Sequence, residues 1–593
     1  MSSEFHKRFE SFMPELTSRL FELYGKRWNF YRILDKLADI LQKAGKEYQE
    51  PDADCDTEWY LSEQQAGYVL YVDLFAENFN GLIKKIPYLQ GLGITYVHLM
   101  PLFKCPEKES DGGYAVSSYR ETDPKLGTIS DLKTALKEFH RAGIRVVVDF
   151  VFNHTSDEHT WALKAKQGSQ FYRNFYFIYK DKSDADDWNR TLREIFPEVR
   201  RGSFTYVKEA GGWVWTTFNP FQWDLNYSNP DVFLAMCAEM LSLANLGVDV
   251  LRLDALAFIW KKKNTCCENL PEAHTLIQAF QYAARIAAPG LVFKSEAIVH
   301  PDEVTRYIGP EECRLSYNPL QMALFWEALA ARDTRLLQSS LKKRWAIPGG
   351  CAWVNYIRCH DDIGWTFSDE DAGKLGINGY SHRQFLNKFY TDRFDGSFAR
   401  GVPFQLNPKT GDCRICGTMA SLAGLEDAYE LHKKQDPRAE LYAEMAVKRI
   451  IMIYTVLAAL PGIPLIYSGD ENAMINDYSY QVDKSRKDDS RWVHRIPFNK
   501  TAVSDSWLSA RQTQITAAIR KIIRCRKTEK LFGHAGIYFH NLQDSHVFGF
   551  TRFLDHECIH VVADFSEQNC LYKIGDRTLH LGPYDVITLK ESI

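Results

Sequence analysis

The sequence lacks concentrated positive charge and any recognisable targeting segment. Its formal net charge is −4 over 593 residues, and no long run of lysine and arginine occurs. Nucleic acids and anionic membranes bind basic faces, so neither is an expected partner. Residues 1–20 are interrupted by charges and contain no apolar core of a signal peptide, which predicts a cytoplasmic protein.

The sequence also lacks a cysteine pattern and an uninterrupted membrane span. Its thirteen cysteines have no repeating spacing, which favours free thiols in a reducing compartment. Cys413-x-x-Cys416 has no second pair to complete a zinc site, so we predict a loop there; no metal and no cofactor is expected. Residues 450–467 are uncharged, but Pro461 and Pro464 divide them, which predicts a buried helix, a tight loop and a buried strand.

The chain does contain a repeated alternation of apolar strands and helical segments. Helical periodicity over 130–142 and 232–246 is typical of the segments between the strands. Such alternation indicates a parallel sheet buried on both faces, and eight units predict a (β/α)8 TIM barrel. The sixth strand is the weakest, and a doubly wound open sheet is the alternative. The eight runs are 67–71, 94–100, 146–152, 248–254, 291–296, 314–317, 353–358 and 465–468.

Breaks in this rhythm predict further domains. The connections after strands three and seven are too long for plain loops, and insertions of this length usually build or cover an active site. Short alternating strands near the end predict an antiparallel β-sandwich. The predicted organisation is an N-terminal helical domain at 1–62, barrel segments at 63–154, 231–362 and 431–528, inserted subdomains at 155–230 and 363–430, and a C-terminal β-domain at 529–593.

Polar side chains follow four of the predicted strands. A lone aspartate after a strand is usually a helix cap or a loop residue. Several buried carboxylates together are costly unless partners or a substrate compensate, so a chance cluster is not expected. Active sites of TIM barrels lie at the carboxyl ends of the strands. The sequence therefore predicts an active site formed by Asp149, Asn153, His154, Arg252, Asp254, Glu296, His360, Asp361 and Asp362.

Paired carboxylates favour glycoside hydrolysis or glycosyl transfer. One carboxylate must be ionised to attack, and the other must keep a proton for the leaving oxygen. Arg252 lies two residues before Asp254, on the same side of the strand, and is expected to keep Asp254 ionised. Surrounding negative charge is expected to raise the pKa of Glu296.

Four segments resemble the ordered signature regions of glycoside hydrolase family 13, the α-amylase family: VVVDFVFNHT, GVDVLRLDALAF, FKSEA and YIRCHDDIGW. The resemblance implies that Asp254 is the nucleophile, Glu296 the general acid/base, and Asp361 a third carboxylate that distorts the sugar. It also implies that His154 and His360 bind glucosyl hydroxyls, and that Arg252 orients the nucleophile.

One departure from the family pattern concerns calcium. Calcium-dependent α-amylases typically carry Lys-His after the nucleophile, where this chain has Ala257 and Phe258. The histidine contributes to the usual calcium site, so its absence argues against calcium and against internal cleavage of starch. Asn153 is retained, but a single ligand does not make a site.

Nearly the whole chain is similar to the amylosucrases and the related sucrose hydrolases, in runs such as LMPLFKCPEKESDGGYAVSSYR, WVWTTFNPFQWDLNYSNP and HDDIGWTFSDEDA. The likeness implies an ion pair between Asp111 and Arg491 that closes the pocket behind the glucosyl unit; an ordinary surface salt bridge is the alternative. It further implies that Tyr114 stacks on the glucosyl ring, Phe218 flanks the cleavage point, Asp362 and Arg414 bind the fructosyl unit, and Arg193 lies in an acceptor channel.

A closed pocket predicts an exo-acting enzyme for a small substrate. We expect cleavage of sucrose with retention, and transfer of the glucosyl unit to the 4-hydroxyl of an α-1,4-glucan or glycogen end. Sucrose hydrolysis is the alternative, while sucrose isomerisation and a non-catalytic amylase-like subunit are more distant ones. The chain is expected to be a monomer or a homodimer.

Overall fold

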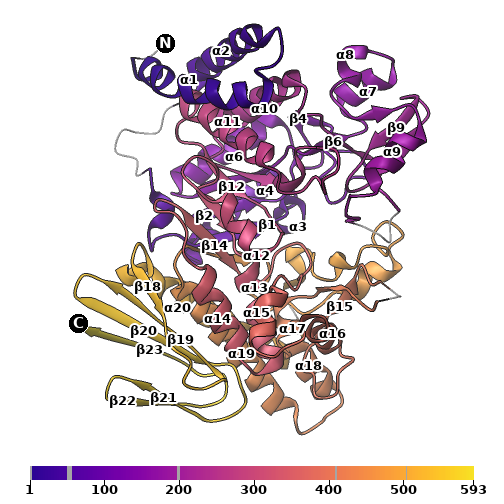
Figure 1. Cartoon of the computed structure of the whole chain (residues 1–593). Coiled ribbons are helices and arrows are strands. Elements are labelled where there is room, and N and C mark those ends of the chain that lie inside the picture. The colour runs from indigo at the N-terminus through magenta and orange to yellow at the C-terminus, as the bar shows by residue number, and fades with distance from the viewer. Residues whose placement is uncertain (1–2, 50–56, 196–200, 408–409, 502–503, 593) are drawn as a thin grey trace.

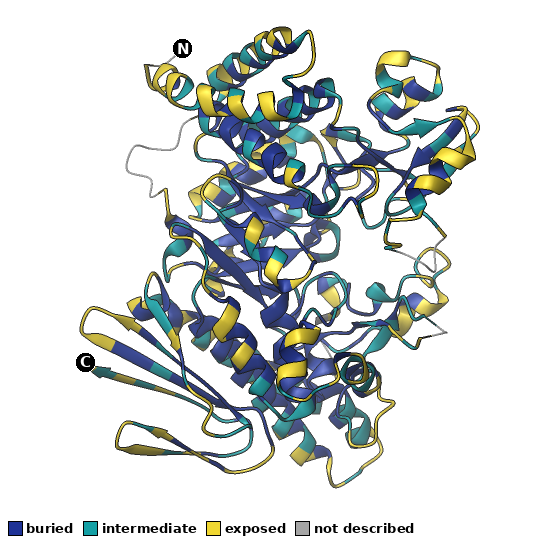
Figure 2. Cartoon of the chain, in the orientation of Figure 1, coloured by how far each residue is buried: buried dark blue, intermediate teal, exposed yellow. Residues whose placement is uncertain are grey.

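The computed structural model describes residues 3–49, 57–195, 201–407, 410–501 and 504–592. Figure 1 shows a central barrel, with N-terminal helices above it and a C-terminal β-sheet below. The elements coloured dark blue in Figure 2 place the buried core in the barrel and in the helices around it.

Eight parallel strands form a closed barrel in the order β1-β17-β14-β13-β12-β11-β5-β2. Every predicted strand is present, and the weakest of them, β13, pairs with both β12 and β14. The predicted TIM barrel is therefore confirmed, and the open-sheet alternative is wrong. The strands are β1 (Gly67–Leu70), β2 (Tyr96–Leu99), β5 (Arg145–Val151), β11 (Val250–Asp254), β12 (Val292–Ser295), β13 (Leu315–Tyr317), β14 (Ala352–Tyr356) and β17 (Ile463–Tyr467).

Helices cover the outside of the barrel, and local signals set their ends. Thr128 and Asp131 form a reciprocal capping box at the start of α6 (Ile129–Arg141). Asn229 caps α10 (Pro230–Leu246), and Gly247 ends that helix with a φ of 105°, a left-handed conformation that favours glycine. The other long helices of this layer are α11 (Pro271–Ala287), α13 (Pro319–Ala331), α19 (Ala439–Ala459) and α20 (Ser506–Thr528).

The apolar stretch 450–467 folds as expected, with the end of α19, a turn and strand β17. No helix in the part of the chain that the structure describes is long and apolar enough to cross a membrane.

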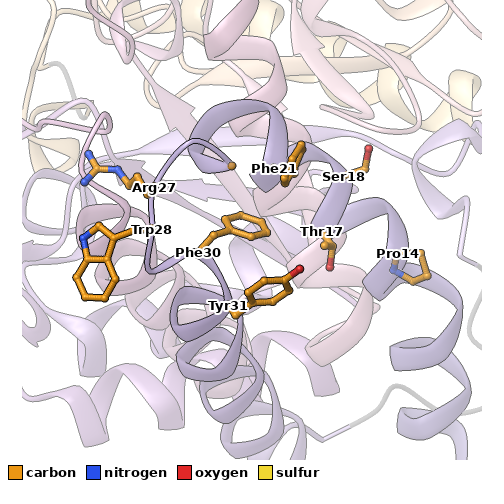
Figure 3. A pocket seen from close by; sticks show the side chains of 9 residues that line it. Pro14, Thr17, Ser18, Phe21, Arg27, Trp28, Phe30 and Tyr31 are labelled. Atoms are coloured by element: carbon orange, nitrogen blue, oxygen red, sulfur yellow. The ribbon is translucent and has the colours of Figure 1, made fainter.

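Two N-terminal helices, α1 (Ser3–Tyr24) and α2 (Phe30–Glu47), pack on α11 and α10 of the barrel. The hydroxyl of Tyr24 donates to the carbonyl of Tyr227 at 2.8 Å. The turn between the two helices borders a cavity of about 550 Å³ (Figure 3). None of the predicted active-site residues lines this cavity; its lining includes Phe21, Arg27, Trp28, Phe30 and Tyr31.

Two insertions carry their own secondary structure. The first holds α7 (Thr160–Lys166), α8 (Gln170–Arg173), α9 (Lys182–Asn189) and the sheet β7-β9-β8 (Ile178–Tyr179, Gly212–Trp215, Phe204–Val207). The second holds α15 (Asp369–Lys374), α16 (Gly379–Tyr390), α17 (Met419–Leu422), α18 (Leu425–Lys433) and the hairpin β15 (Val402–Phe404) with β16 (Arg414–Cys416). Strand β16 begins at Arg414, so the loop predicted at Cys413-x-x-Cys416 is wrong from Arg414 onward, because hairpin pairing with β15 fixes this segment.

The C-terminal part is an antiparallel sheet of β18 (Gly536–Phe539), β19 (Val547–Leu554), β20 (Glu557–Asp564) and β23 (Val586–Ser592). Phe548, Phe550 and Val561 lie in the main hydrophobic core that continues into the barrel. The hairpin of β21 (Cys570–Ile574) and β22 (Arg577–Leu581) packs on the opposite face through Val562 and Tyr572. The sheet is thus apolar on its barrel side and partly covered on its outer side.

Candidate active site

Strand register brings the predicted catalytic groups to one end of the barrel. Arg252 of β11 lies beside Asp149 of β5 and beside Lys294 of β12. Asp254 is the last residue of β11, and Glu296 follows β12 directly. Because neighbouring strands are parallel and in register, these side chains enter the barrel at adjacent levels.

A buried arginine connects three carboxylates at this end. Arg252 Nη1 lies 2.6 Å from Asp254 Oδ1 and 2.6 Å from Asp149 Oδ1, and its Nη2 lies 3.6 Å from Glu296 Oε1. The chain turns at Ala255, whose φ of 54° is left-handed, and the Ala255 N–H donates to Glu296 Oε2 at 3.1 Å. The turn therefore orients Glu296 from the adjacent strand.

The two facing carboxyls compete for one proton. Burial raises the pKa of Glu296 and raises that of Asp254 more strongly, while Arg252 lowers both. The charged guanidinium contact to Asp254 is the shorter, at 2.6 Å against 3.6 Å for Glu296. Coulomb attraction weakens with distance, and this charged donor outweighs the neutral amide of Ala255. The shorter contact with Arg252 therefore favours the ionised form of Asp254 over the ionised form of Glu296.

Asp361 lies beside three basic groups. Its Oδ2 is 3.0 Å from His360 Nε2, and its Oδ1 is 3.5 Å from both Arg491 and Arg495. Burial opposes ionisation, but these neighbours hold the pKa of Asp361 well below its usual value. The hydroxyl of Tyr114 lies 2.9 Å from His360 Nε2, and the two rings stack. The Asp361 carboxylate is therefore held beside the His360 imidazole, which stacks on Tyr114.

The predicted ion pair between Asp111 and Arg491 is formed. Arg491 Nη2 donates to Asp111 Oδ1 at 3.0 Å, and each side chain is only 13% exposed. Arg491 also pairs with Asp489, with its Nε 2.8 Å from Oδ1. The pair is too enclosed to be an ordinary surface salt bridge, whose contribution is small.

Other predicted residues border the same region. His154 Nε2 lies 3.1 Å from Gln222 Nε2, and the His154 ring contacts Phe218 with centroids 5.3 Å apart. Gln222 also donates to Asp111 at 3.4 Å, which links this group to the closing pair. Asp362 lies 3.3 Å from Arg414, which the second insertion supplies on β16.

Arg193 is not brought together with these groups. Its side chain is 57% exposed, and its Nη2 pairs with Glu268 Oε1 at 2.8 Å. Glu268 belongs to the loop after β11, so the pair joins the first insertion to the barrel. The acceptor-channel prediction for Arg193 stays a prediction.

A lysine ammonium lies where Asn153 and Phe258 approach each other. Lys261 Nζ is 2.7 Å from Asp224 Oδ2 and donates to the carbonyl of Phe258 at 2.6 Å. The side chain of Asn153 also donates to Asp224, at 3.3 Å. A protein cation thus neutralises the buried Asp224.

Known proteins are similar to much of this chain. Residues 55–344 match the α-amylase catalytic domain. The trehalose synthase of Pimelobacter sp. (strain R48) is 29% identical over 408 residues, covering 67% of this chain and 63% of that protein. The glucosylglycerate phosphorylase of Escherichia coli (strain K12) is 25% identical over 480 residues, covering 78% and 77%. Residues 55–344 are thus similar to the catalytic domain of the α-amylase family.

Solved structures share this fold. Isomaltulose synthase from Klebsiella sp. LX3 superposes with a TM-score of 0.63 at 18% identity, covering 89% of this chain and 99% of that one. Sucrose 6F-phosphate phosphorylase from Thermoanaerobacter thermosaccharolyticum gives 0.65 at 18% identity, covering 92% and 100%. The chain spans between 36% and 63% of the length of the trehalose synthases it matches.

The barrel also has a polar floor, which sequence reasoning did not predict. His98 Nε2 is 3.2 Å from Asp149, and its Nδ1 is 3.0 Å from the Tyr317 hydroxyl and 3.2 Å from Lys294 Nζ. Burial lowers the pKa of His98 to about 3 and that of Lys294 well below its usual value. The signal was present: His98 and Lys294 are strongly polar residues within buried strands, and Lys294 lies two residues before Glu296.

Proposed function

We propose that the protein is a retaining glucosyltransferase that cleaves sucrose, releases fructose and transfers the glucosyl unit to the 4-hydroxyl of an α-1,4-glucan. The observation that carries this proposal is the arrangement around Arg252: a closely paired Asp254, a more distant Glu296, and Asp361 beside the enclosed Asp111–Arg491 pair.

The first step assigns the negative charge to Asp254 and the proton to Glu296. Glu296 donates its proton to the bridging oxygen as the bond to the fructosyl unit breaks, and ionised Asp254 attacks the anomeric carbon. The product is a β-glucosyl ester of Asp254 and free fructose. In the second step Glu296, now a carboxylate, removes the proton of the acceptor hydroxyl, which displaces Asp254. Two inversions retain the α configuration.

A small, terminal sugar fits this site best. The Asp111–Arg491 pair lies beside Asp361 and closes the region where a glucosyl unit binds, so a chain that continued past that unit would meet the pair. Tyr114, stacked on His360, offers an aromatic face for the sugar ring. These contacts support exo action and not internal cleavage of a polymer.

Sucrose as donor rests on the sequence likeness given above and on Asp362. That carboxylate is adjacent to Asp361 and pairs with Arg414 at 3.3 Å, on the side supplied by the second insertion. Charged hydrogen-bonding groups at this place suit the hydroxyls of a fructosyl leaving group. The relatives are named for trehalose and glucosylglycerate, both of which contain a glucosyl unit, and this supports an α-glucoside as the donor class.

Hydrolysis is the second candidate, because Arg193 is engaged with Glu268 and does not lie free to receive a glucan. In that case water replaces the acceptor hydroxyl in the second step, and the catalytic groups keep the same roles.

The test is incubation of the protein with sucrose alone, with fructose, glucose, isomeric disaccharides and α-1,4-glucan quantified over time. Fructose far in excess of glucose, with amylase-digestible polymer, supports the proposal. Equal fructose and glucose without polymer indicates a hydrolase, and isomeric disaccharides indicate an isomerase. A parallel incubation with trehalose identifies a different donor, since turnover of trehalose but not of sucrose would contradict the proposal.

A further inference from the structure

Two clusters of metal-ligand type occur in the described part of the chain, and one of them lies outside the active site. The first contains His360 and Asp361 and belongs to the catalytic region. The second consists of Cys558, His560 and Glu591, whose ligand atoms all lie within 4.8 Å of one another. It belongs to the C-terminal sheet, and the proposed function does not involve it.

Strand geometry places the three side chains on one face. Cys558 and His560 are two residues apart on β20, so they project from the same side of the sheet. Glu591 of β23 is the register partner of Cys558, and directly opposed residues share a face. This is the outer face, because Ile559 and Val561, which alternate with them, lie in the core that continues into the barrel.

The separations from the imidazole nitrogen to the other two side chains match those required by a tetrahedral ion. His560 Nε2 is 3.5 Å from Cys558 Sγ and 3.5 Å from Glu591 Oε2. An N–H···O bond at 3.5 Å is too long to be strong. Zinc bonds of about 2.3 Å to sulfur and about 2.0–2.1 Å to nitrogen or oxygen, at the tetrahedral angle, place ligand atoms about 3.3–3.6 Å apart.

A chain of hydrogen bonds orients the imidazole. His560 Nδ1 is 2.7 Å from the Thr551 hydroxyl, which is 2.7 Å from His540 Nε2. His540 Nδ1 is 3.0 Å from the Tyr572 hydroxyl, in space left by Gly549, where a Cβ would come within 2.7 Å of both groups. With His560 Nδ1 donating to Thr551, the lone pair of Nε2 faces Cys558 and Glu591. Metal-binding histidines are typically fixed in this way through the other ring nitrogen.

Charge and access also suit a divalent cation. A Cys558 thiolate and the Glu591 carboxylate supply two negative charges, and a neutral His560 supplies the third ligand. Arg577 lies 3.4 Å from the other oxygen of Glu591, which holds that carboxylate in place. Cys558 is buried, whereas Glu591 is partly exposed, so one position of the ion faces water.

We propose that Cys558, His560 and Glu591 bind Zn²⁺, with water as the fourth ligand. The ion would join β20 to the edge strand β23 and so fasten the last strand of the chain to its sheet. The proposal does not rest on the proposed function.

The test uses the full chain after dialysis against a chelator. Titration with Co²⁺ should give a thiolate-to-cobalt charge-transfer band that saturates at one ion per chain, and competition with a chromophoric chelator gives the Zn²⁺ affinity. In the Cys558→Ser variant the band should vanish. Thr551→Val should weaken Zn²⁺ binding about 10–100-fold, as loss of an outer partner does. Cys525→Ser removes an exposed thiol on α20 and is the matched control, with no expected change.

Circular dichroism and thermal melting in chelator show whether each variant is folded. If Cys558→Ser does not fold, Glu591→Gln at the partly exposed position replaces it and should also lose Zn²⁺ affinity. Absence of the charge-transfer band in the unaltered chain overturns the proposal. So does equal Zn²⁺ binding by the unaltered chain, Thr551→Val and Glu591→Gln.

Discussion

Replacement of Lys261 by methionine tests whether the barrel depends on its own internal cation. Lys261 and Asp224 pair at 2.7 Å, with side chains 1% and 0% exposed. Methionine keeps most of the volume and removes the charge. Breaking a buried ion pair from one side typically costs about 3–5 kcal/mol, because an uncompensated charge stays in the interior.

The remaining hydrogen-bond partners of Asp224 place the expected loss of stability at the lower end of this range. Its oxygens still accept from the Thr217 N–H at 2.7 Å and from the Thr217 hydroxyl at 2.6 Å. We therefore expect a loss of about 3 kcal/mol in the free energy of unfolding. The lysine ammonium lies 5.0 Å from the centre of the ring of Trp215, one of fourteen tryptophans whose fluorescence follows urea unfolding.

The adjacent Lys262 provides a matched control. It is 57% exposed and pairs with Glu272 on the surface, so Lys262→Met should cost no more than about 1 kcal/mol. The double variant Lys261→Met with Asp224→Asn should recover part of the loss, since it removes the unpaired charge. Equal urea midpoints for Lys261→Met and Lys262→Met would refute the reasoning.

Three further outcomes are expected. Glu296→Gln should lower turnover of the glucosyl donor about 10²–10⁴-fold, as loss of a general acid does, while circular dichroism shows an unchanged fold. Unaltered steady-state turnover would contradict the role of Glu296 as general acid. Asp111→Ala should lower kcat/KM for a disaccharide donor about 10–100-fold, because it removes a charged hydrogen bond. The variant should also accept longer maltooligosaccharides, while Arg491 keeps its contact with Asp489. An unchanged ratio of kcat/KM for long and short donors would argue against a closing pair. Burial raises the pKa of Glu471 from 4.5 to about 7, so the folded state holds a proton that the unfolded chain releases. The contribution of Glu471 to the free energy of unfolding is complete below about pH 4.5 and is lost as pH rises through 7, by about 3 kcal/mol in all. Glu471→Gln should therefore remove the pH dependence of urea midpoints measured between pH 5 and pH 8.

Local patterns in the sequence predicted the barrel well. Even the three-residue strand β13 was found, because apolar runs at regular intervals carry the parallel-sheet signal. The spacing of Arg252 and Asp254 likewise predicted their contact, since residues two apart on a strand share a side.

Contacts between distant segments could not be predicted from local patterns. Asp111 and Arg491 are 380 positions apart, and only the family resemblance paired them. The pairing of Arg193 with Glu268 and the floor formed by His98 depend on how whole elements pack, which periodicity does not encode. A single buried polar residue in a strand has many possible partners, so its pattern alone names none of them.

The first insertion leaves and rejoins the barrel at one place. The short ribbon of β6 (His154–Ser156) and β10 (Gln222–Asp224) pairs its two ends, and the N–H of Asp157 donates to the carbonyl of Phe221 at 2.9 Å. The ribbon therefore holds the two ends of the insertion together, independently of the segment between them. The insertion is in this sense an exchangeable cassette: replacing residues 158–220 with the equivalent segment of a relative should alter the acceptor side while His154 and Asp224 keep their positions on the ribbon.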